Sequence, residues 1–265
     1  FAIVPLSFGV SPFMVFTEGM LSWPPDPDAW SLRWYQNMIG NCSSEVVSST
    51  VPCSNKWMIG TVNSFFIGII STFIATALGT IAALGLSRPH MPFKGLIMAI
   101  LISPMIVPLI ITAAGMFFFY ARINLVYTFT GVILAHVALA TPFVVITVTA
   151  TLVGFDMNMV KASQSLGARP VKTFFRVIMP LILPGIISGA LFAFITSFDE
   201  VVIVMFMASL DQLTIPKQMW AGIRQEISPV ILCMATCLVA LSIFLLTTVE
   251  LLRRRSERLR GIKAR

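Results

Sequence analysis

Two adjacent carboxylates stand inside an otherwise apolar stretch. Asp199 and Glu200 lie within Leu181–Ala208, and Thr196 and Ser197 add hydroxyl groups about one turn earlier. An ionisable side chain at such a depth in a membrane costs about 2.5–3.5 kcal/mol unless it is paired or hydrated, so it usually has a function. Adjacent residues on a helix point about 100° apart, so only one carboxylate is expected to face a path squarely.

If the chain crosses a membrane, these four polar residues would form a patch on a path for solute, where a carboxylate would attract a cation such as an ammonium group. The alternative is a gate or an interface anchor, in which the acidic pair would meet a cation on a partner subunit. The residue types alone leave both interpretations open, and they do not say which carboxylate would contact the substrate.

The other reactive residue types give no sign of covalent chemistry. His90 and His136 lie in separate segments, and the sequence holds no Ser–His–Asp or metal-ligand pattern. The phosphate-binding pattern G-x-x-x-x-G-K-[ST] is also absent from the sequence. We therefore expect no catalytic residue, metal or cofactor on this chain. His136 is interpreted as a hydrogen-bonded structural histidine, with a polar path residue as the alternative.

The four cysteines fall into two pairs. Cys42 and Cys53 lie in a polar loop and would form a disulfide if that loop lies outside the cytoplasm, with two unpaired thiols as the alternative. Cys233 and Cys237 lie four residues apart in an apolar run, where we expect them to pack as small apolar side chains.

The composition indicates a membrane protein. Of the 265 residues, 57% are hydrophobic and 11% are charged, whereas a soluble domain has about 25% charged residues. Five runs are long enough to cross a bilayer as helices: Met58–Leu86, Leu96–Phe119, Gly131–Val153, Leu181–Ala208 and Ile227–Leu252. The short apolar segment Phe1–Phe8 is interpreted as the outer end of a first helix whose beginning is missing. The sequence thus predicts an all-α membrane protein of about six spans, forming a single transmembrane domain over 1–265.

The basic residues set the expected orientation. If successive loops alternate sides, thirteen Lys and Arg residues fall on one side and five on the other. The richer side is predicted to be cytoplasmic; it includes the loop at 154–180 and the tail at 253–265, while the loop at 17–57 faces outward. Most tryptophans near the outer loops are expected to be interfacial anchors: Trp23, Trp30, Trp34, Trp57 and Trp220. The net charge of +7 follows this arrangement, so nucleic-acid binding is not expected.

The loop at 154–180 has the pattern of two short helices joined at Gly167. Asp156 is placed to cap the first helix, and Pro170 suits the first turn of the second. An apolar stripe follows at i, i+3, i+4 and i+7: Val171, Phe174, Phe175 and Ile178. Such an elbow would suit a membrane protein that is moved by a soluble motor. An amphipathic loop on the lipid surface is the alternative.

The same loop resembles the EAA loop of type I ABC importer permeases, whose pattern is E-A-A, three residues, Gly, nine residues and I-x-L-P. Lys161-Ala162-Ser163, Gly167, Val177 and Met179-Pro180 occupy these positions here. Lys161 stands where the family usually has Glu, which alters any salt bridge from this position to the ATPase. The resemblance implies that the following residues form the surface that docks on the ATPase: Lys161, Ala162, Ser163, Leu166, Gly167, Ala168, Pro170, Phe174, Phe175 and Pro180.

Five further segments resemble the permeases of spermidine/putrescine, opine, aminoethylphosphonate and 4-aminobutyrate importers. They are SLRWY (31–35), SPMIVP (103–108), LAHVALATPFVV (134–145), LPGIISGALFAF (183–194) and SFDEVVI (197–203). The resemblance implies a permease of the bacterial inner membrane, and the basic residues of the tail predict a cytoplasmic C-terminus. The expected substrate is a polyamine or a related small amine, with 4-aminobutyrate, an opine or aminoethylphosphonate as alternatives.

The resemblance also implies the partners. They are a homologous second permease, two ATPase subunits that carry ATP and Mg²⁺, an extracytoplasmic solute-binding protein, and membrane lipid. The rival from another class is a stand-alone secondary transporter, which would need no ATPase and usually has inverted repeats that we do not see in this sequence. A structural scaffold would leave the acidic pair unexplained. Co-purification with an ATPase and a second permease would separate these readings.

Overall fold

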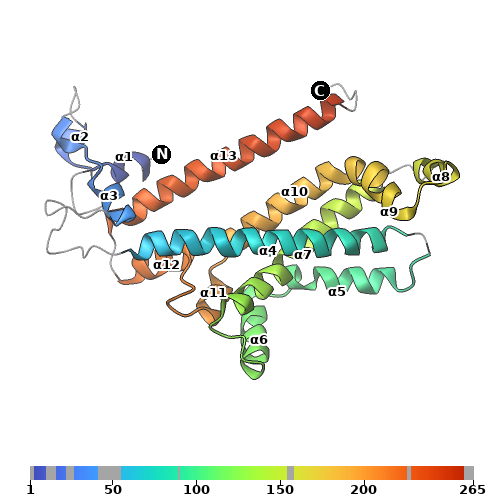
Figure 1. The fold of residues 1–265 in the computed structure, drawn as a ribbon. Coiled ribbons are helices and arrows are strands. Elements are labelled where there is room, and N and C mark those ends of the chain that lie inside the picture. Colours follow the sequence, from blue (N-terminus) through green and yellow to red (C-terminus); the bar gives the residue numbers. More distant parts are fainter. Residues whose placement is uncertain are drawn as a thin grey trace. The chain divides into compact units, whose positions relative to one another are not determined.

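The computed structural model describes residues 3–9, 16–21, 27–40, 55–88, 90–153, 158–225 and 228–259 (Figure 1). These residues are helical, apart from turns, loops and one isolated bridge between Gly9 and Trp30. The chain divides into two compact units: Phe1–Ser64 with Leu210–Leu251 forms unit 1, and Phe65–Ser209 with Leu252–Arg265 forms unit 2. A single domain over 1–265 therefore stays a prediction.

The two units share two long helices. The helices α4 (Lys56–Leu86) and α13 (Pro229–Leu259) each contribute residues to both units. Unit 1 also contains α1 (Ile3–Ser7), α2 (Glu18–Leu21), η1 (Pro27–Ala29), α3 (Arg33–Ile39) and α12 (Ile215–Gln225). Unit 2 contains α5 (Lys94–Ile106), α6 (Leu109–Arg122), α7 (Phe129–Val153), α8 (Asn158–Ser165), α9 (Pro170–Thr173), the π-helical turn η2 (Phe174–Ile178), α10 (Met179–Phe198) and α11 (Val202–Met207).

Four helical segments in the described residues are long and apolar enough to cross a membrane: Lys56–Leu86, Phe129–Val153, Pro170–Phe198 and Pro229–Thr248. A fifth would be the pair α5 and α6, which is bent by 103° at its break. The predicted all-helical membrane class is confirmed. Of the expected first span, the described residues contain only α1, with 5 residues.

The apolar run Leu96–Phe119, in which Pro104 and Pro108 are expected to interrupt the span, is broken between α5 and α6. Val107 has an extended backbone, with φ −70° and ψ 134°. Pro108 follows it, and the residue before a proline is pushed out of the helical region by the proline ring. Pro104, in contrast, lies inside α5 without ending it.

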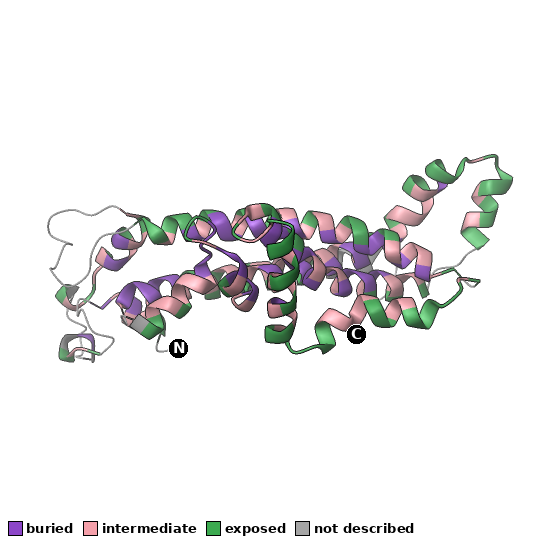
Figure 2. Ribbon diagram, turned by 90° about the horizontal axis from the view of Figure 1, so that it is seen from below, coloured by how far each residue is buried: buried purple, intermediate pink, exposed green. Residues whose placement is uncertain are grey.

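Unit 2 is held together by the packing of α7 against α10, which lie side by side (Figure 1). Two glycines on α10 permit this close approach. A Cβ atom on Gly185 would collide with the hydroxyl oxygen of Thr151, and one on Gly189 would lie 3.0 Å from the Cα atom of Val144. Small residues four apart are a common means of close helix contact in membranes. Buried residues gather along these helices in Figure 2.

We expect Gly189→Leu to force α7 and α10 apart, because the new side chain has no room beside Val144. Overpacking of this kind costs about 1–3 kcal/mol, so the melting temperature of the purified protein should fall. The matched control is Gly115→Leu on α6, where an added Cβ would meet nothing within 4 Å. Equal melting temperatures for the two variants would contradict this packing argument.

Unit 1 has its own small core around Trp34. The indole of Trp34 is 2% exposed and packs with Val230 and Cys233. Its Nε1–H group donates a hydrogen bond of 2.9 Å to the carbonyl oxygen of Gly9. Trp34 is therefore a core residue and is not among the interfacial anchors, a role expected of most of the five tryptophans. Trp30 and Trp220 are exposed and remain predicted anchors.

Candidate transport path and coupling elbow

The acidic pair lies at a break between two helices. The helix α10 ends at Phe198 and α11 begins at Val202, so the prediction of a continuous span over Leu181–Ala208 is wrong here. The carboxylate of Glu200 explains the break. Its Oε1 atom accepts a hydrogen bond of 2.8 Å from the backbone N–H of Ile203, one of the donors that the first turn of a helix leaves without a helical partner.

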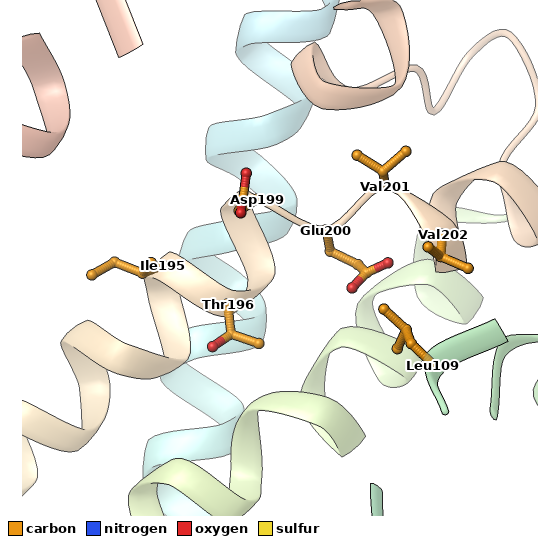
Figure 3. A pocket seen from close by; sticks show the side chains of 7 residues that line it. All are labelled: Leu109, Ile195, Thr196, Asp199, Glu200, Val201 and Val202. Carbon is orange, nitrogen blue, oxygen red and sulfur yellow. The ribbon is translucent and has the colours of Figure 1, made fainter. Parts of the chain in front are cut away.

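The two carboxylates have different surroundings. Glu200 is 7% exposed and is held against the start of α11 by its bond to Ile203. Asp199 is exposed, and its side chain points away from that of Glu200 (Figure 3). The helix break, and not helical spacing, separates the two side chains, and which of them faces a substrate path stays a prediction.

A cavity of about 410 Å³ opens beside this break. Its polar lining comes from Thr196, Asp199 and Glu200, and the remaining lining is aliphatic (Figure 3): Leu109, Ile195, Val201 and Val202. Leu109 is the first residue of α6, so the break between α5 and α6 also reaches this cavity. In a membrane, non-helical backbone is tolerated where it is buried in protein or lines a water-filled cavity.

Ser197 does not line this cavity. Its hydroxyl group is buried and lies 2.8 Å from Nδ1 of His136 on α7, so it faces the neighbouring helix. His136 is 1% exposed and hydrogen-bonded, as its structural interpretation expected. Its second ring nitrogen, Nε2, is buried without a hydrogen-bond partner.

The loop after α7 forms the elbow that the sequence predicts. The helix α8 ends in a left-handed glycine, because Gly167 has φ +79°. The N–H of Gly167 bonds to the carbonyl of Gln164 at 2.9 Å, and the N–H of Ala168 bonds to that of Ser163 at 3.1 Å. This pair of bonds is the Schellman motif, which satisfies the last carbonyls of a helix. The chain then re-enters a helix at Pro170. Asp156, the predicted cap, lies outside the described residues.

The two arms of the elbow are tied together by hydroxyl groups. Ser163 Oγ on α8 lies 2.9 Å from Thr173 Oγ1 on α9, and Thr173 is 2% exposed. The serine occupies the position of the second alanine in the EAA pattern. Here it supplies a polar contact across the elbow that an alanine would lack.

Apolar side chains on the elbow are left exposed. Leu166 is 88% exposed, Val171 69% and Phe175 61%. Phe174 and Ile178 are half-buried instead, and Ile178 packs against the core of unit 2. The predicted single stripe is therefore divided between an exposed and an inward side, because the π-helical turn changes the helical spacing.

The remaining elbow residues of the predicted ATPase contact divide in the same way. Lys161, Ala162, Gly167, Pro170 and Pro180 are exposed, and Ser163 and Ala168 are half-buried. Figure 2 shows that the elbow end of unit 2 is mostly exposed.

One helical run connects the elbow to the acidic break. Pro170–Phe198 is helical over 29 residues, from α9 through η2 to the end of α10. At 1.5 Å per residue, this run is roughly 43 Å long. Figure 1 shows the elbow at one end of α10 and α11 at the other. The elbow and the acidic break are therefore joined by helical residues alone, with the π-helical turn η2 among them.

Cys42 and Cys53 lie outside the described residues, as do parts of the loop at 17–57 and of the tail at 253–265. Cys233 is a buried thiol whose Sγ atom lies 3.3 Å from the carbonyl oxygen of Ser7, and Cys237 is exposed. Within the described ranges, no three His, Cys, Asp or Glu side chains gather as a metal site.

Comparison with known proteins shows which family has this architecture. Residues 75–258 match the binding-protein-dependent transport system inner membrane components. The chain belongs to this family. It is thus the permease subunit of a binding-protein-dependent ABC importer, embedded in the inner membrane by several helices. Such a permease works with an ATPase, which hydrolyses the ATP, and with a binding protein and a second permease.

Several curated permeases are similar over most of their length. The spermidine/putrescine transport system permease protein PotC of Haemophilus influenzae is 26% identical over 237 residues, covering 89% of this chain and 86% of PotC. PotC of Escherichia coli is 27% identical over 192 residues, covering 72% and 73%. The putrescine transport system permease protein PotI of Escherichia coli is 29% identical over 215 residues, covering 78% and 72%.

A solved structure has a similar fold. The permease resembles a chain of the MetNI methionine ABC transporter in an inward-facing conformation, with a TM-score of 0.53 and 18% identity. The match covers 77% of this permease and 95% of the other chain. At this identity the likeness concerns the fold alone.

Proposed function

We propose that this permease imports a polyamine, and that Asp199 contacts an ammonium group of the substrate on its path. The cavity beside the helix break carries the proposal. It combines carboxylates with aliphatic walls, and a polyamine combines ammonium groups with methylene chains. The names of PotC and PotI, which are spermidine/putrescine and putrescine permeases, support the same substrate class.

The two carboxylates would have different roles. Glu200 is buried and already accepts the N–H of Ile203, so its primary task is to hold the start of α11. Asp199 is exposed and lines the cavity, so its carboxylate is open to an arriving cation. Thr196 would add a hydroxyl acceptor from the same turn of α10.

The elbow would be the docking site of the ATPase, with two ATPase subunits serving this permease and its homologous partner. Its exposed apolar side chains, Leu166, Val171 and Phe175, suit a protein interface, because exposed apolar patches commonly mark such contacts. Lys161 would present a positive charge beside them in place of the family's usual Glu. The excess of basic residues supports a cytoplasmic elbow and a cytoplasmic C-terminus.

Truncation of the most exposed elbow side chain should weaken ATPase binding. For Leu166→Ser we expect the dissociation constant of the ATPase to rise by about tenfold or more, since burial of a leucine side chain contributes roughly 1.5–3 kcal/mol. The control is Gln164→Ser, which changes another exposed side chain of α8. Both variants would be measured by titrating the ATPase onto the purified pair of permeases. Equal affinities would place the ATPase contact elsewhere.

The substrate class would be tested with the complete complex in the presence of its solute-binding protein. Spermidine, putrescine, 4-aminobutyrate and aminoethylphosphonate would each be assayed for binding to that protein and for stimulation of ATP hydrolysis. We expect spermidine or putrescine to bind and to stimulate. Stimulation by only 4-aminobutyrate or aminoethylphosphonate would reject the polyamine assignment and leave the coupling mechanism intact.

A further inference from the structure

One buried polar contact fixes the end of α10 next to the acidic break. His136 Nδ1 on α7 and Ser197 Oγ on α10 are 2.8 Å apart, and the two residues are 1% and 5% exposed. Ser197 lies in the last turn of α10, whose final backbone bond runs from the N–H of Asp199 to the carbonyl of Ile195 at 3.0 Å.

The position of Ser197 determines what this contact can control. Adjacent residues on a helix point about 100° apart. When Ser197 faces α7, Thr196 is turned toward the cavity, and Asp199 also reaches its lining. A rotation of this last turn would move both cavity residues together. The contact to His136 is therefore placed to set the direction of Thr196 and Asp199.

The rest of the α7–α10 interface cannot fix that rotation equally well. It depends on close approach at Gly185 and Gly189 and on apolar packing. These glycines lie further back along α10, since Gly189 is eight residues before Ser197, so they act less directly on the last turn. A hydrogen bond has a narrow range of distance and angle, so it specifies one orientation.

A histidine at position 136 is less favourable for packing than an apolar side chain would be. Its Nε2 atom is buried without a partner, and an unsatisfied buried polar atom costs about 1–3 kcal/mol. An apolar side chain of similar size would avoid this cost. The remaining gain from the imidazole is the directed contact of Nδ1 with Ser197.

We propose that His136 and Ser197 are positioning residues of the transport path, which hold the last turn of α10 so that Thr196 and Asp199 face the cavity. This inference rests on the proposed function of Asp199. Neither positioning residue touches the substrate: His136 acts through Ser197, and Ser197 acts through the helix turn that it shares with Asp199.

The test uses the complete reconstituted complex with its solute-binding protein and measures ATP hydrolysis against spermidine concentration. Ser197→Ala and His136→Leu remove the contact. Each should raise the half-maximal spermidine concentration about two- to tenfold, the range that corresponds to one lost hydrogen bond. The double variant should be no worse than either single variant, because both remove the same contact.

Conservative variants separate positioning from general stability. The amide of an asparagine can occupy the place of Nδ1. The half-maximal spermidine concentration of His136→Asn should therefore be close to that of the wild type, whereas that of His136→Leu should be raised. Ser197→Thr keeps the hydroxyl and should behave like the asparagine variant. The control is Thr141→Ala on α7, whose hydroxyl bonds only to the carbonyl of Val137 in its own helix, at 2.7 Å.

The outcomes distinguish this inference from the proposed function. If wild-type complex responds to spermidine and Asp199→Asn weakens the response, but Ser197→Ala and His136→Leu leave it normal, only the positioning inference is overturned. Additive effects, or no rescue by asparagine, would also overturn it. If spermidine does not stimulate the wild-type complex at all, the polyamine proposal fails and the positioning inference falls with it.

Discussion

Replacing Gly167 by proline should abolish the stimulation of ATP hydrolysis by substrate while the permease still assembles with its partners. Gly167 has φ +79°, and proline is locked near φ −65°. The variant therefore cannot form the left-handed end of α8, and the two arms of the elbow would change direction. The measurement is ATP turnover by the complete complex with and without substrate and solute-binding protein.

A graded series makes this prediction sharper. A Cβ atom on Gly167 would meet nothing within 4 Å, so only backbone strain, of about 1–2 kcal/mol for a left-handed residue, opposes Gly167→Ala. Asparagine tolerates the left-handed region better than alanine. Stimulated turnover should thus fall in the order Gly, Asn, Ala, Pro.

The control for this series is Gly95→Ala in the first turn of α5, which also has free space around its Cβ and lacks a positive φ. It should leave stimulated turnover unchanged. Normal turnover in Gly167→Pro would show that the elbow does not carry motion from the ATPase to the permease.

Neutralising Asp199 should weaken the response to a cationic substrate more than any other single change in the cavity. Hydrogen bonds to charged groups contribute about 1.5–3 kcal/mol. Asp199→Asn should therefore raise the half-maximal spermidine concentration by about tenfold or more. It should leave the melting temperature near that of the wild type, because Asp199 is exposed.

Glu200 should respond in a different pattern. The amide oxygen of Glu200→Gln can still accept the N–H of Ile203, so this variant should keep its melting temperature and lose only the effect of the charge. Glu200→Ala loses the acceptor as well, and removal of a helix cap costs about 1 kcal/mol. It should lower the melting temperature of the complex.

The matched control for charge is Glu18→Gln, which removes an exposed carboxylate that does not line the cavity. It should change neither the melting temperature nor the spermidine response. Wild-type affinity and turnover in both Asp199→Asn and Glu200→Gln would remove these carboxylates from the transport path.

The elbow was the part of the site that local sequence patterns predicted best. Gly167 and Pro170 act on the backbone of their own segment, so their effects are visible without the rest of the fold. The division of the apolar stripe was missed, because the π-helical turn at Phe174–Ile178 has no distinct sequence signal. The ends of two apolar runs, Met58–Leu86 and Gly131–Val153, lie within two residues of the ends of α4 and α7.

The two helix breaks show where sequence patterns reach their limit. Pro108 signals an interruption after α5, but the bend of 103° depends on packing of α6 against other parts of unit 2. The break after Phe198 contains neither glycine nor proline. It is stabilised by the side chain of Glu200. The surrounding residues are apolar, so their hydrophobicity predicts a continuous helix at this point.

Contacts between residues that are distant in the sequence are the part of the structure that sequence patterns predict least well. The sequence pattern places Ser197 with Thr196 on a polar patch, whereas in the structure its partner is His136, 61 positions away. The position of Trp34 in an outer loop suits a membrane anchor, whereas in the structure its indole packs against Val230 and Cys233 of α13. In both cases the partner is fixed only when the helices have packed.

The most direct test of the proposed mechanism is uptake of radiolabelled spermidine by proteoliposomes that contain the complete complex. Uptake should require ATP on the side of the ATPase and the solute-binding protein on the other side, and both Gly167→Pro and Asp199→Asn should reduce it strongly. Uptake that continues without ATPase subunits, or that follows an ion gradient in their absence, would contradict an ATP-driven permease and indicate a stand-alone transporter.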